Sequence, residues 1–158
     1  MIEILLKLLQ WAAKTVREVP AGSNGGYWVE LIQRWGGGVK GDSWCAFFVY
    51  FVGTLAAIAS GGTWPLPRTG SCEVLHQYAI KNKLLSPVPR TGDVYLLLDE
   101  HGRAHHTGFV VQPQLEQFDE VSGNTSDPSK PPSREGWGVF PHSRAYDDTK
   151  YRFIRWLP

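Results

Sequence analysis

The spacing of apolar residues changes once along this chain, near Pro89, and that change constrains the fold more than any other feature. Before Pro89 the apolar side chains recur every three or four residues, and after it they lie in short extended runs. Helices followed by strands are typical of an α+β domain, with helices packed on one face of a mostly antiparallel sheet. We therefore expect residues 1–158 to form a single α+β domain.

Four segments before Pro89 are predicted to be helices, and glycines or prolines follow each of them. They are residues 2–18, 27–35, 44–59 and 71–83. Ser71 is placed to cap the last helix, and Asp42 or Ser43 to cap the third. The third helix is apolar over residues 46–59, too short for a bilayer, which needs about 20 residues. We interpret it as a buried core helix.

Four runs after Pro89 have the composition and alternation of strands. They are residues 94–98, 106–111, 115–122 and 151–156. Clusters of Gly, Pro, Asn and Asp separate them, as turns require. Residues 123–133 are rich in Ser, Pro, Asp and Lys, which predicts a surface loop.

The totals of this sequence exclude several classes of function. Sixteen basic and fifteen acidic side chains give a net charge of +1, so no global field attracts nucleic acid or anionic lipid. The first nine residues lack the basic start and the cleavage site of a signal peptide, so we expect synthesis in the cytoplasm. We also expect a monomer with no integral membrane segment.

No cofactor or metal is expected. The sequence contains no calcium-binding loop, and the three histidines within residues 101–106 do not have the spacing of a zinc site. A zinc site there is the less favoured alternative. His105 is expected on the opposite sheet face from His106, at a rim, and His76 and His142 to be surface or packing residues.

Cys45 stands where a polar turn becomes the apolar third helix. A sulfur in the first turn of a helix faces unpaired backbone N–H groups, which favour the thiolate. The thiolate is the nucleophilic form of cysteine. Cys72, the other cysteine, also follows a potential cap, but Glu73 beside it opposes a thiolate. We interpret Cys72 as structural, although a disulfide between the two remains an alternative that excludes a free nucleophile.

His106 and Asn124 follow Cys45 in the order of a cysteine hydrolase. His106 opens a predicted strand and has a side chain that titrates near neutrality, as a general base requires. Asn124 can accept the imidazole N–H through its side-chain oxygen and fix the tautomer. The competing interpretation of Cys45 is a buried inert thiol.

At this level of detail the sequence resembles a known family, the CHAP domain of bacterial and phage cell-wall hydrolases. This cysteine- and histidine-dependent amidohydrolase/peptidase module belongs to the papain-like superfamily. The residues that carry the likeness are Asn24-Gly25-Gly26, Ser43-Trp44-Cys45-Ala46-Phe47-Phe48, Gly92-Asp93-Val94, His106-Thr107-Gly108-Phe109-Val110-Val111, Ser122-Gly123-Asn124-Thr125, Gly138-Val139-Phe140 and Arg144. They span nearly the whole chain in the family's order.

The resemblance implies a papain-like fold in which Cys45 is the nucleophile and His106 the general base and then acid. It also implies peptidoglycan as the partner, cut at an amide bond by an N-acetylmuramoyl-L-alanine amidase or a peptide endopeptidase. Family members often have Glu-Gly-Asn where this chain has Ser122-Gly123-Asn124. Asn124 is therefore the expected orienting residue, with Ser122 or Glu120 as possible support.

Three further residues are candidates for a substrate groove. Trp44 adjoins the nucleophile, Trp137 lies in a glycine-flanked segment, and Asn24 begins a glycine-rich turn. For both tryptophans core packing is an equal alternative, and for Asn24 a simple turn between helices.

Two other functions remain open from the sequence. One is a papain-like hydrolase or toxin that acts on another amide substrate. The other is a catalytically weakened module that binds the cell wall, which the serine at position 122 would favour. A wall hydrolase without a signal peptide would reach its substrate by lysis, a holin or a secretion system, as a phage lysin or a bacterial effector does.

Overall fold

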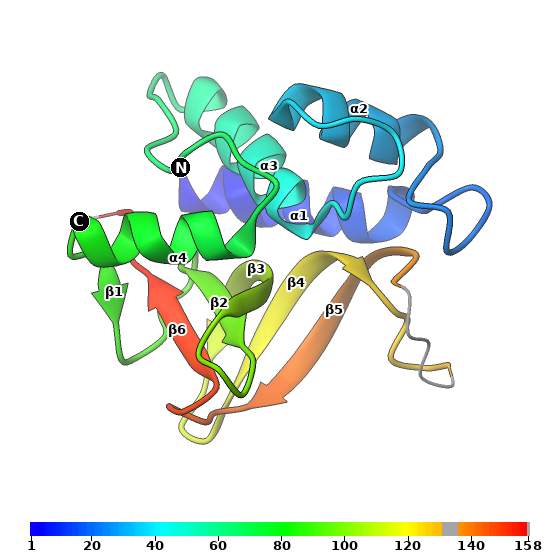
Figure 1. The fold of residues 1–158 in the computed structure, drawn as a ribbon. Coiled ribbons are helices and arrows are strands. Elements are labelled where there is room, and N and C mark those ends of the chain that lie inside the picture. Colours follow the sequence, from blue (N-terminus) through cyan, green and yellow to red (C-terminus); the bar gives the residue numbers. More distant parts are fainter. Residues whose placement is uncertain (131–135, 158) are drawn as a thin grey trace.

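A computed structural model describes residues 1–130 and 136–157 of the chain (Figure 1). Its helices are α1 (Ile2–Thr15), α2 (Tyr27–Gly36), α3 (Cys45–Ala59) and α4 (Cys72–Lys81). Its strands are β1 (Leu85–Ser86), β2 (Val94–Leu98), β3 (Ala104–Pro113), β4 (Gln117–Thr125), β5 (Gly138–Ala145) and β6 (Tyr151–Ile154). The strands form one antiparallel sheet in the order β1-β6-β2-β3-β4-β5. The predicted α+β class is confirmed.

Helix α3 lies at the centre of the molecule. It contacts α1, α2, β3 and β4, and Figure 1 shows the helices together on one side of the sheet. Ten of its fifteen residues are buried, because its apolar surface runs all the way round. The predicted core helix is thus confirmed, and no helix among the described residues is long and apolar enough to cross a membrane.

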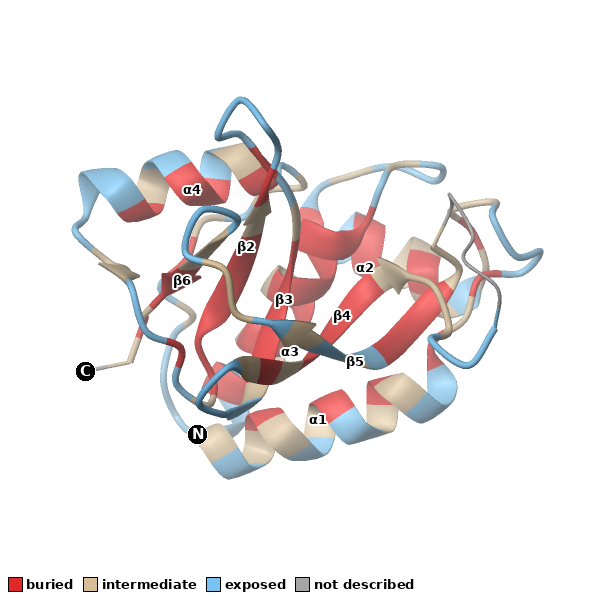
Figure 2. Cartoon of the chain, turned by 90° about the horizontal axis from the view of Figure 1, so that it is seen from below, coloured by how far each residue is buried: buried red, intermediate tan, exposed pale blue. Residues whose placement is uncertain are grey.

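The sheet has two buried faces. Side chains alternate along each strand, so one face of β2 directs Val94 and Leu96 toward the helices. The opposite face carries a second, smaller core of Tyr95, Val110, Phe118 and Phe153. Figure 2 shows that buried residues dominate α3 and the central strands, whereas α1 buries only one side.

The longest strand that the sequence did not predict is β5. Its first three residues are buried, but its second half alternates between exposed and half-buried residues and begins with Pro141, so no apolar alternation marks it. The chain after α1 pairs with this strand: the Val16 carbonyl accepts a hydrogen bond from Val139 N–H at 3.1 Å. Helix α1 therefore ends at Thr15 instead of the predicted residue 18.

The predicted loop at residues 123–133 is wrong at its start. Residues 123–125 belong to β4, because Gly123 lets the strand pack closely against Phe48 of α3. Residues 131–133 lie outside the described part of the chain. The other predicted strands agree with β2, β3, β4 and β6 to within a few residues at their ends.

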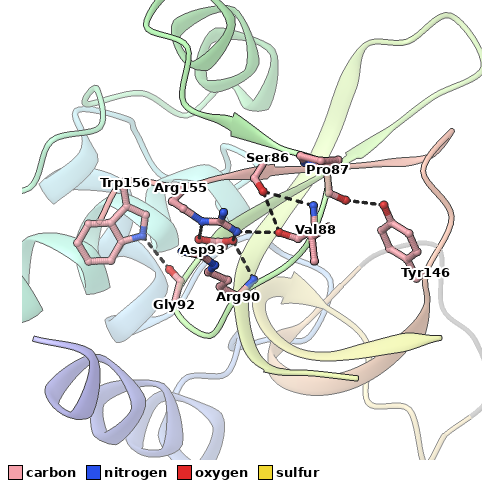
Figure 3. A network of polar contacts seen from close by, with 9 residues as sticks. All are labelled: Ser86, Pro87, Val88, Arg90, Gly92, Asp93, Tyr146, Arg155 and Trp156. Carbon is pink, nitrogen blue, oxygen red and sulfur yellow. Dashed lines mark hydrogen bonds and ion pairs between the residues drawn. The ribbon is translucent and has the colours of Figure 1, made fainter. Parts of the chain in front are cut away.

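A polar cluster fastens the end of the chain to the start of the sheet (Figure 3). Arg155 forms an ion pair with Asp93 at 2.9 Å and donates to the Val88 carbonyl at 2.7 Å. The indole N–H of Trp156 donates to the Gly92 carbonyl at 2.7 Å. These bonds hold β6 beside β2 and complete the sheet that supports the candidate site.

Candidate functional site

Cys45 is the first residue of α3. The first intrahelical hydrogen bond runs from Phe48 N–H to the Trp44 carbonyl at 2.8 Å. The N–H groups of the first turn that come before Phe48 therefore have no backbone partner within the helix. Trp44 occupies the cap position, and its side chain makes no cap hydrogen bond. The predicted cap by Asp42 or Ser43 is wrong, because the Asp42 carboxylate accepts instead from Val39 N–H at 2.9 Å.

The head of a second helix meets the head of α3. Cys72 is the first residue of α4, where the Ser71 hydroxyl accepts a hydrogen bond from Val74 N–H at 3.3 Å as predicted. The two sulfur atoms, Cys45 Sγ and Cys72 Sγ, are 3.6 Å apart, and both are free thiols. The sequence interpretation made Cys72 structural, and the structure adds that its sulfur is in contact with that of Cys45.

The pKa values of the two thiols are shifted in opposite directions. A hydrogen bond from Cys72 is the largest cause that holds the pKa of Cys45 well below its usual range; His106 and the Ala46 N–H add to it, and burial opposes it. The same hydrogen bond, burial and repulsion from the Cys45 charge raise the pKa of Cys72, and Glu73 adds to that rise. Cys45 is therefore the more acidic of the two thiols.

His106 comes from β3, paired with Leu97 of β2, and its ring lies 6.2 Å from that of Tyr95, centroid to centroid. By hydrogen bonding and by its charge it is the main contributor to the lowered Cys45 pKa besides Cys72. Its Nε2 atom is buried and has no hydrogen-bond partner. The neighbouring His105 is exposed, as expected.

Asn124 lies close to His106 but does not bond to it. Both residues line a pocket of about 230 Å³ together with Thr125 and Arg144. The Asn124 side-chain oxygen is buried without a partner, like His106 Nε2, so the predicted hydrogen bond is not made in this structure. The cause is local: the pairing of β4 with β5 shifts register between Ser122 and Thr125, and Asn124 has a positive φ of 57°.

Ser122 and Glu120 belong to β4, the strand that also carries Asn124. Both are fully buried, and the Ser122 hydroxyl donates to Glu120 Oε1 at 3.3 Å, which places them on one strand face as predicted. The same carboxylate oxygen accepts from Arg144 at 2.7 and 2.8 Å. Glu120 is thus occupied by Arg144 rather than by His106. Arg144 comes from β5, the strand that the sequence did not reveal.

The candidate groove residues fall in three different places. Trp44 is completely buried, and its indole N–H donates to Glu18 Oε1 at 2.8 Å. Its predicted contact with substrate is wrong, because the ring forms part of the core below the helix head. Trp137 is half-buried and packs on Phe140, with ring centroids 4.6 Å apart.

Asn24 belongs to a turn that is fixed by its backbone. Its N–H donates to Glu18 Oε2 at 3.0 Å, and its carbonyl accepts from Gln33 at 2.9 Å. Gln33 also donates to the Asp42 carbonyl at 2.8 Å. This bridge ties the Asn24 turn to the turn that leads into Cys45, and the Asn24 side-chain oxygen is buried without a partner.

A second hollow lies at the turn before Cys45. It has a volume of about 310 Å³ and is lined by Asp42, Ser43, Phe47 and Gly70. Phe47 fits there because Gly70 has no side chain: a Cβ atom on Gly70 would lie 2.3 Å from the ring. The hollow is therefore bounded by the segments that precede both cysteines.

Within the part of the chain that the structure describes, no group of three His, Cys, Asp or Glu side chains could hold a metal ion. Comparisons with protein-family models, with curated proteins and with solved structures found no match to this chain.

Proposed function

We propose that this protein is a papain-like cysteine hydrolase that cleaves an amide bond of peptidoglycan, with Cys45 as its nucleophile. One observation carries the proposal: Cys45 is the first residue of α3, and its contacts with a neighbouring thiol and with the imidazole of His106 lower its pKa. A buried thiol that served only for packing would have its pKa raised by its apolar surroundings.

The proposed reaction follows from the positions of these groups. Cys45 Sγ attacks the carbonyl carbon of the scissile amide, and the charge that develops on the carbonyl oxygen is stabilised by N–H groups at the start of α3. His106, which holds the proton taken from the Cys45 thiol, gives it to the leaving amine, and the amine departs and leaves a thioester on Cys45. His106 then takes a proton from water, whose oxygen attacks the thioester and releases the acid.

Asn124 is the proposed orienting residue for His106. His106 Nε2 and the Asn124 side-chain oxygen are a buried donor site and a buried acceptor, each without a partner, in the same pocket. A buried polar group without a partner costs about 1–3 kcal/mol, so a small shift that joins them is favourable. Catalytic hydrogen bonds are often loose before substrate binds.

The choice of peptidoglycan rests on the resemblance of the sequence motifs to the CHAP module. The net charge of +1 provides no overall attraction for a polymer, so a glycan or peptide strand must be held by local contacts. Gly136 lines the His106 pocket, and the next residue, Trp137, is half-buried. Trp137 is the aromatic side chain proposed for that role.

A catalytically weakened wall-binding module is the second candidate. The specific observation in its favour is the absence of any hydrogen bond to His106 Nε2. Such a module would bind the wall without releasing products, so the two functions predict different results in one assay.

Purified peptidoglycan from several wall types provides the test. Wild type, Cys45→Ala and His106→Gln would be incubated with each wall, and the amines and muropeptides released would be identified by mass spectrometry. Of these three proteins, we expect only the wild type to release products. His101→Gln serves as the matched control, since the His101 side chain is 76% exposed. This variant should retain full activity.

The same assay distinguishes the alternatives. Sedimentation of the wild type with the wall, without release of products, would favour the binding module. The absence of both binding and release from every wall type would overturn the peptidoglycan proposal and favour another amide substrate. Equal release by Cys45→Ala would exclude Cys45 as the nucleophile.

A further inference from the structure

The contact between the chain's two cysteines has a consequence beyond hydrolysis. Cys45 and Cys72 are the only cysteines in the sequence. They come from the heads of two different helices, 27 residues apart, and their sulfur atoms are separated by 3.6 Å. A contact between a thiolate and a second thiol is not required for amide hydrolysis, but it is the arrangement needed for disulfide formation.

We propose that Cys45 and Cys72 are a peroxide-sensitive pair that forms a reversible intramolecular disulfide and thereby switches the nucleophile off. The proposal rests on the proposed function only in assigning Cys45 as the nucleophile. It names the regulation of that site and the chemical class of the oxidant, a small peroxide.

The geometry permits this bond with local movement. A disulfide requires a sulfur separation of about 2.05 Å, and the thiols already touch. Both side chains stand on first helical residues, so rotation about their χ1 bonds requires no helix to break. The hollow lined by Asp42, Ser43, Phe47 and Gly70 includes the residues two positions before each cysteine.

The reaction proceeds in two balanced steps. The Cys45 thiolate attacks one peroxide oxygen: an S–O bond forms, the O–O bond breaks, and the leaving alkoxide or hydroxide takes up a proton. Cys72 sulfur then attacks the sulfur of the resulting sulfenic acid. The S–S bond forms, the S–O bond breaks, and the departing hydroxide leaves as water with the Cys72 proton. The peroxide gains two electrons, one from each sulfur.

The electrostatics of the pair favour this order of events. Before oxidation the hydrogen bond with Cys45 is the largest cause that raises the pKa of Cys72, and a negative charge on Cys45 adds to the rise. Formation of the sulfenic acid removes that charge, so two of the causes that keep Cys72 protonated disappear. Cys72 becomes a better nucleophile only after Cys45 has been oxidised.

The low exposure of both sulfurs favours a small oxidant. Cys45 is 5% exposed and Cys72 is 6% exposed. A small peroxide needs less room to meet the Cys45 sulfur than the thiol of a second protein needs to meet Cys72. The disulfide should therefore be intramolecular, and a small thiol reductant should reverse it.

Hydrogen peroxide and the intact folded protein provide the test. After treatment with a small excess of peroxide, wild type should lose both titratable thiols and the mass of two hydrogens, and a peptide map should join Cys45 to Cys72. Dithiothreitol should restore both thiols. Cys72→Ser should instead gain oxygen on Cys45 and, after longer exposure, fail to recover its thiol with dithiothreitol.

Wild type alone decides the proposal if Cys72→Ser does not fold. Oxygen addition to Cys45 with Cys72 still titratable would overturn it, as would a disulfide between two chains. These measurements count thiols and mass, so they are independent of wall hydrolysis. If the disulfide forms but no muropeptides are released, the proposed function fails and the switch stands. If muropeptides are released but no disulfide forms, only the switch is rejected.

Discussion

At the scale of single residues, the proposed role of Asn124 is to orient His106 for its work with Cys45. Its oxygen and His106 Nε2 lack partners although both line one pocket, and its φ of 57° is a conformation that few residues besides glycine and asparagine adopt readily. A useful substitution at position 124 must remove the amide group without straining the backbone, so that the effect of losing the amide can be measured alone.

The matched variants are Asn124→Gly and Asn124→Asp. Glycine accepts the positive φ and removes the side chain, so we expect kcat to fall by about 10-fold or more with little change in KM. Aspartate keeps a side-chain acceptor and stabilises the imidazolium, so it should retain activity. Kinetics of amine release from peptidoglycan measure both. Full activity of Asn124→Gly would show that this residue does not orient His106.

The sequence predicts the site residues with uneven success, for physical reasons. Cys45 and His106 can be recognised as candidates because their order and side-chain chemistry are typical of a nucleophile and its base. The contact of Cys72 is not, because it depends on how two helix heads meet in space. Ser71 before α4 signals that Cys72 is also a thiol at the start of a helix. The sequence cannot give the distance between the Cys72 and Cys45 sulfurs.

At the scale of secondary-structure elements, Gly123 controls the approach of β4 to α3. A Cβ atom at this position would lie 2.6 Å from the Trp44 ring and 2.8 Å from Phe48 Cβ. Glycine thus brings the strand that carries Asn124 against the helix that carries Cys45. The same close approach explains why residues 123–125 continue a strand where composition predicted a loop.

Gly123→Ala should lower the free energy of unfolding by about 1–3 kcal/mol, because the added methyl group overfills a packed interface. It should also reduce hydrolysis by displacing Asn124. Gly62→Ala is the matched control, since a Cβ atom there has no neighbour closer than 3.6 Å, and should change stability by less than about 0.5 kcal/mol. Urea denaturation measures both; equal values would exclude the packing role of Gly123.

Helices were easier to predict than strands for a related reason. Each helix has a local spacing and an end signal, such as Gly37 after α2, which has the left-handed conformation that glycine favours. Strand β5 has no such signal, because its residues beyond Phe140 are exposed or half-buried. What makes it a strand is its pairing with β4, a contact between distant parts of the chain.

At the scale of the whole molecule, the sheet is completed by the last residues of the chain. Strand β6 pairs with both β1 and β2, and Arg155 fastens it to the buried Asp93 carboxylate. Burial raises the pKa of Asp93, and the hydrogen bond and charge of Arg155 oppose that rise. Removal of Arg155 would leave a buried carboxylate without its ion partner.

Arg155→Met should therefore lower the free energy of unfolding by about 1–3 kcal/mol near neutral pH. Because the folded-state pKa of Asp93 then rises further above its unfolded value, the loss should shrink as the pH falls and the carboxyl becomes protonated. Lys150→Met removes an exposed ion pair with Asp147 and should cost less than about 1 kcal/mol. Urea titrations at several pH values measure this; a loss independent of pH would contradict it.

The central claim is that Cys45 is an activated thiolate, and the rate of its alkylation by iodoacetamide as a function of pH tests it most directly. The two cysteines have nearly equal exposure, 5% and 6%, so a difference in rate reports their ionisation. We expect Cys45 to react much faster than Cys72 at neutral pH and to stay reactive well below pH ~8.5, the usual pKa of a thiol. Cys72→Ala should move the Cys45 profile to higher pH. Equal rates for the two cysteines, with an ordinary midpoint for Cys45, would contradict the account.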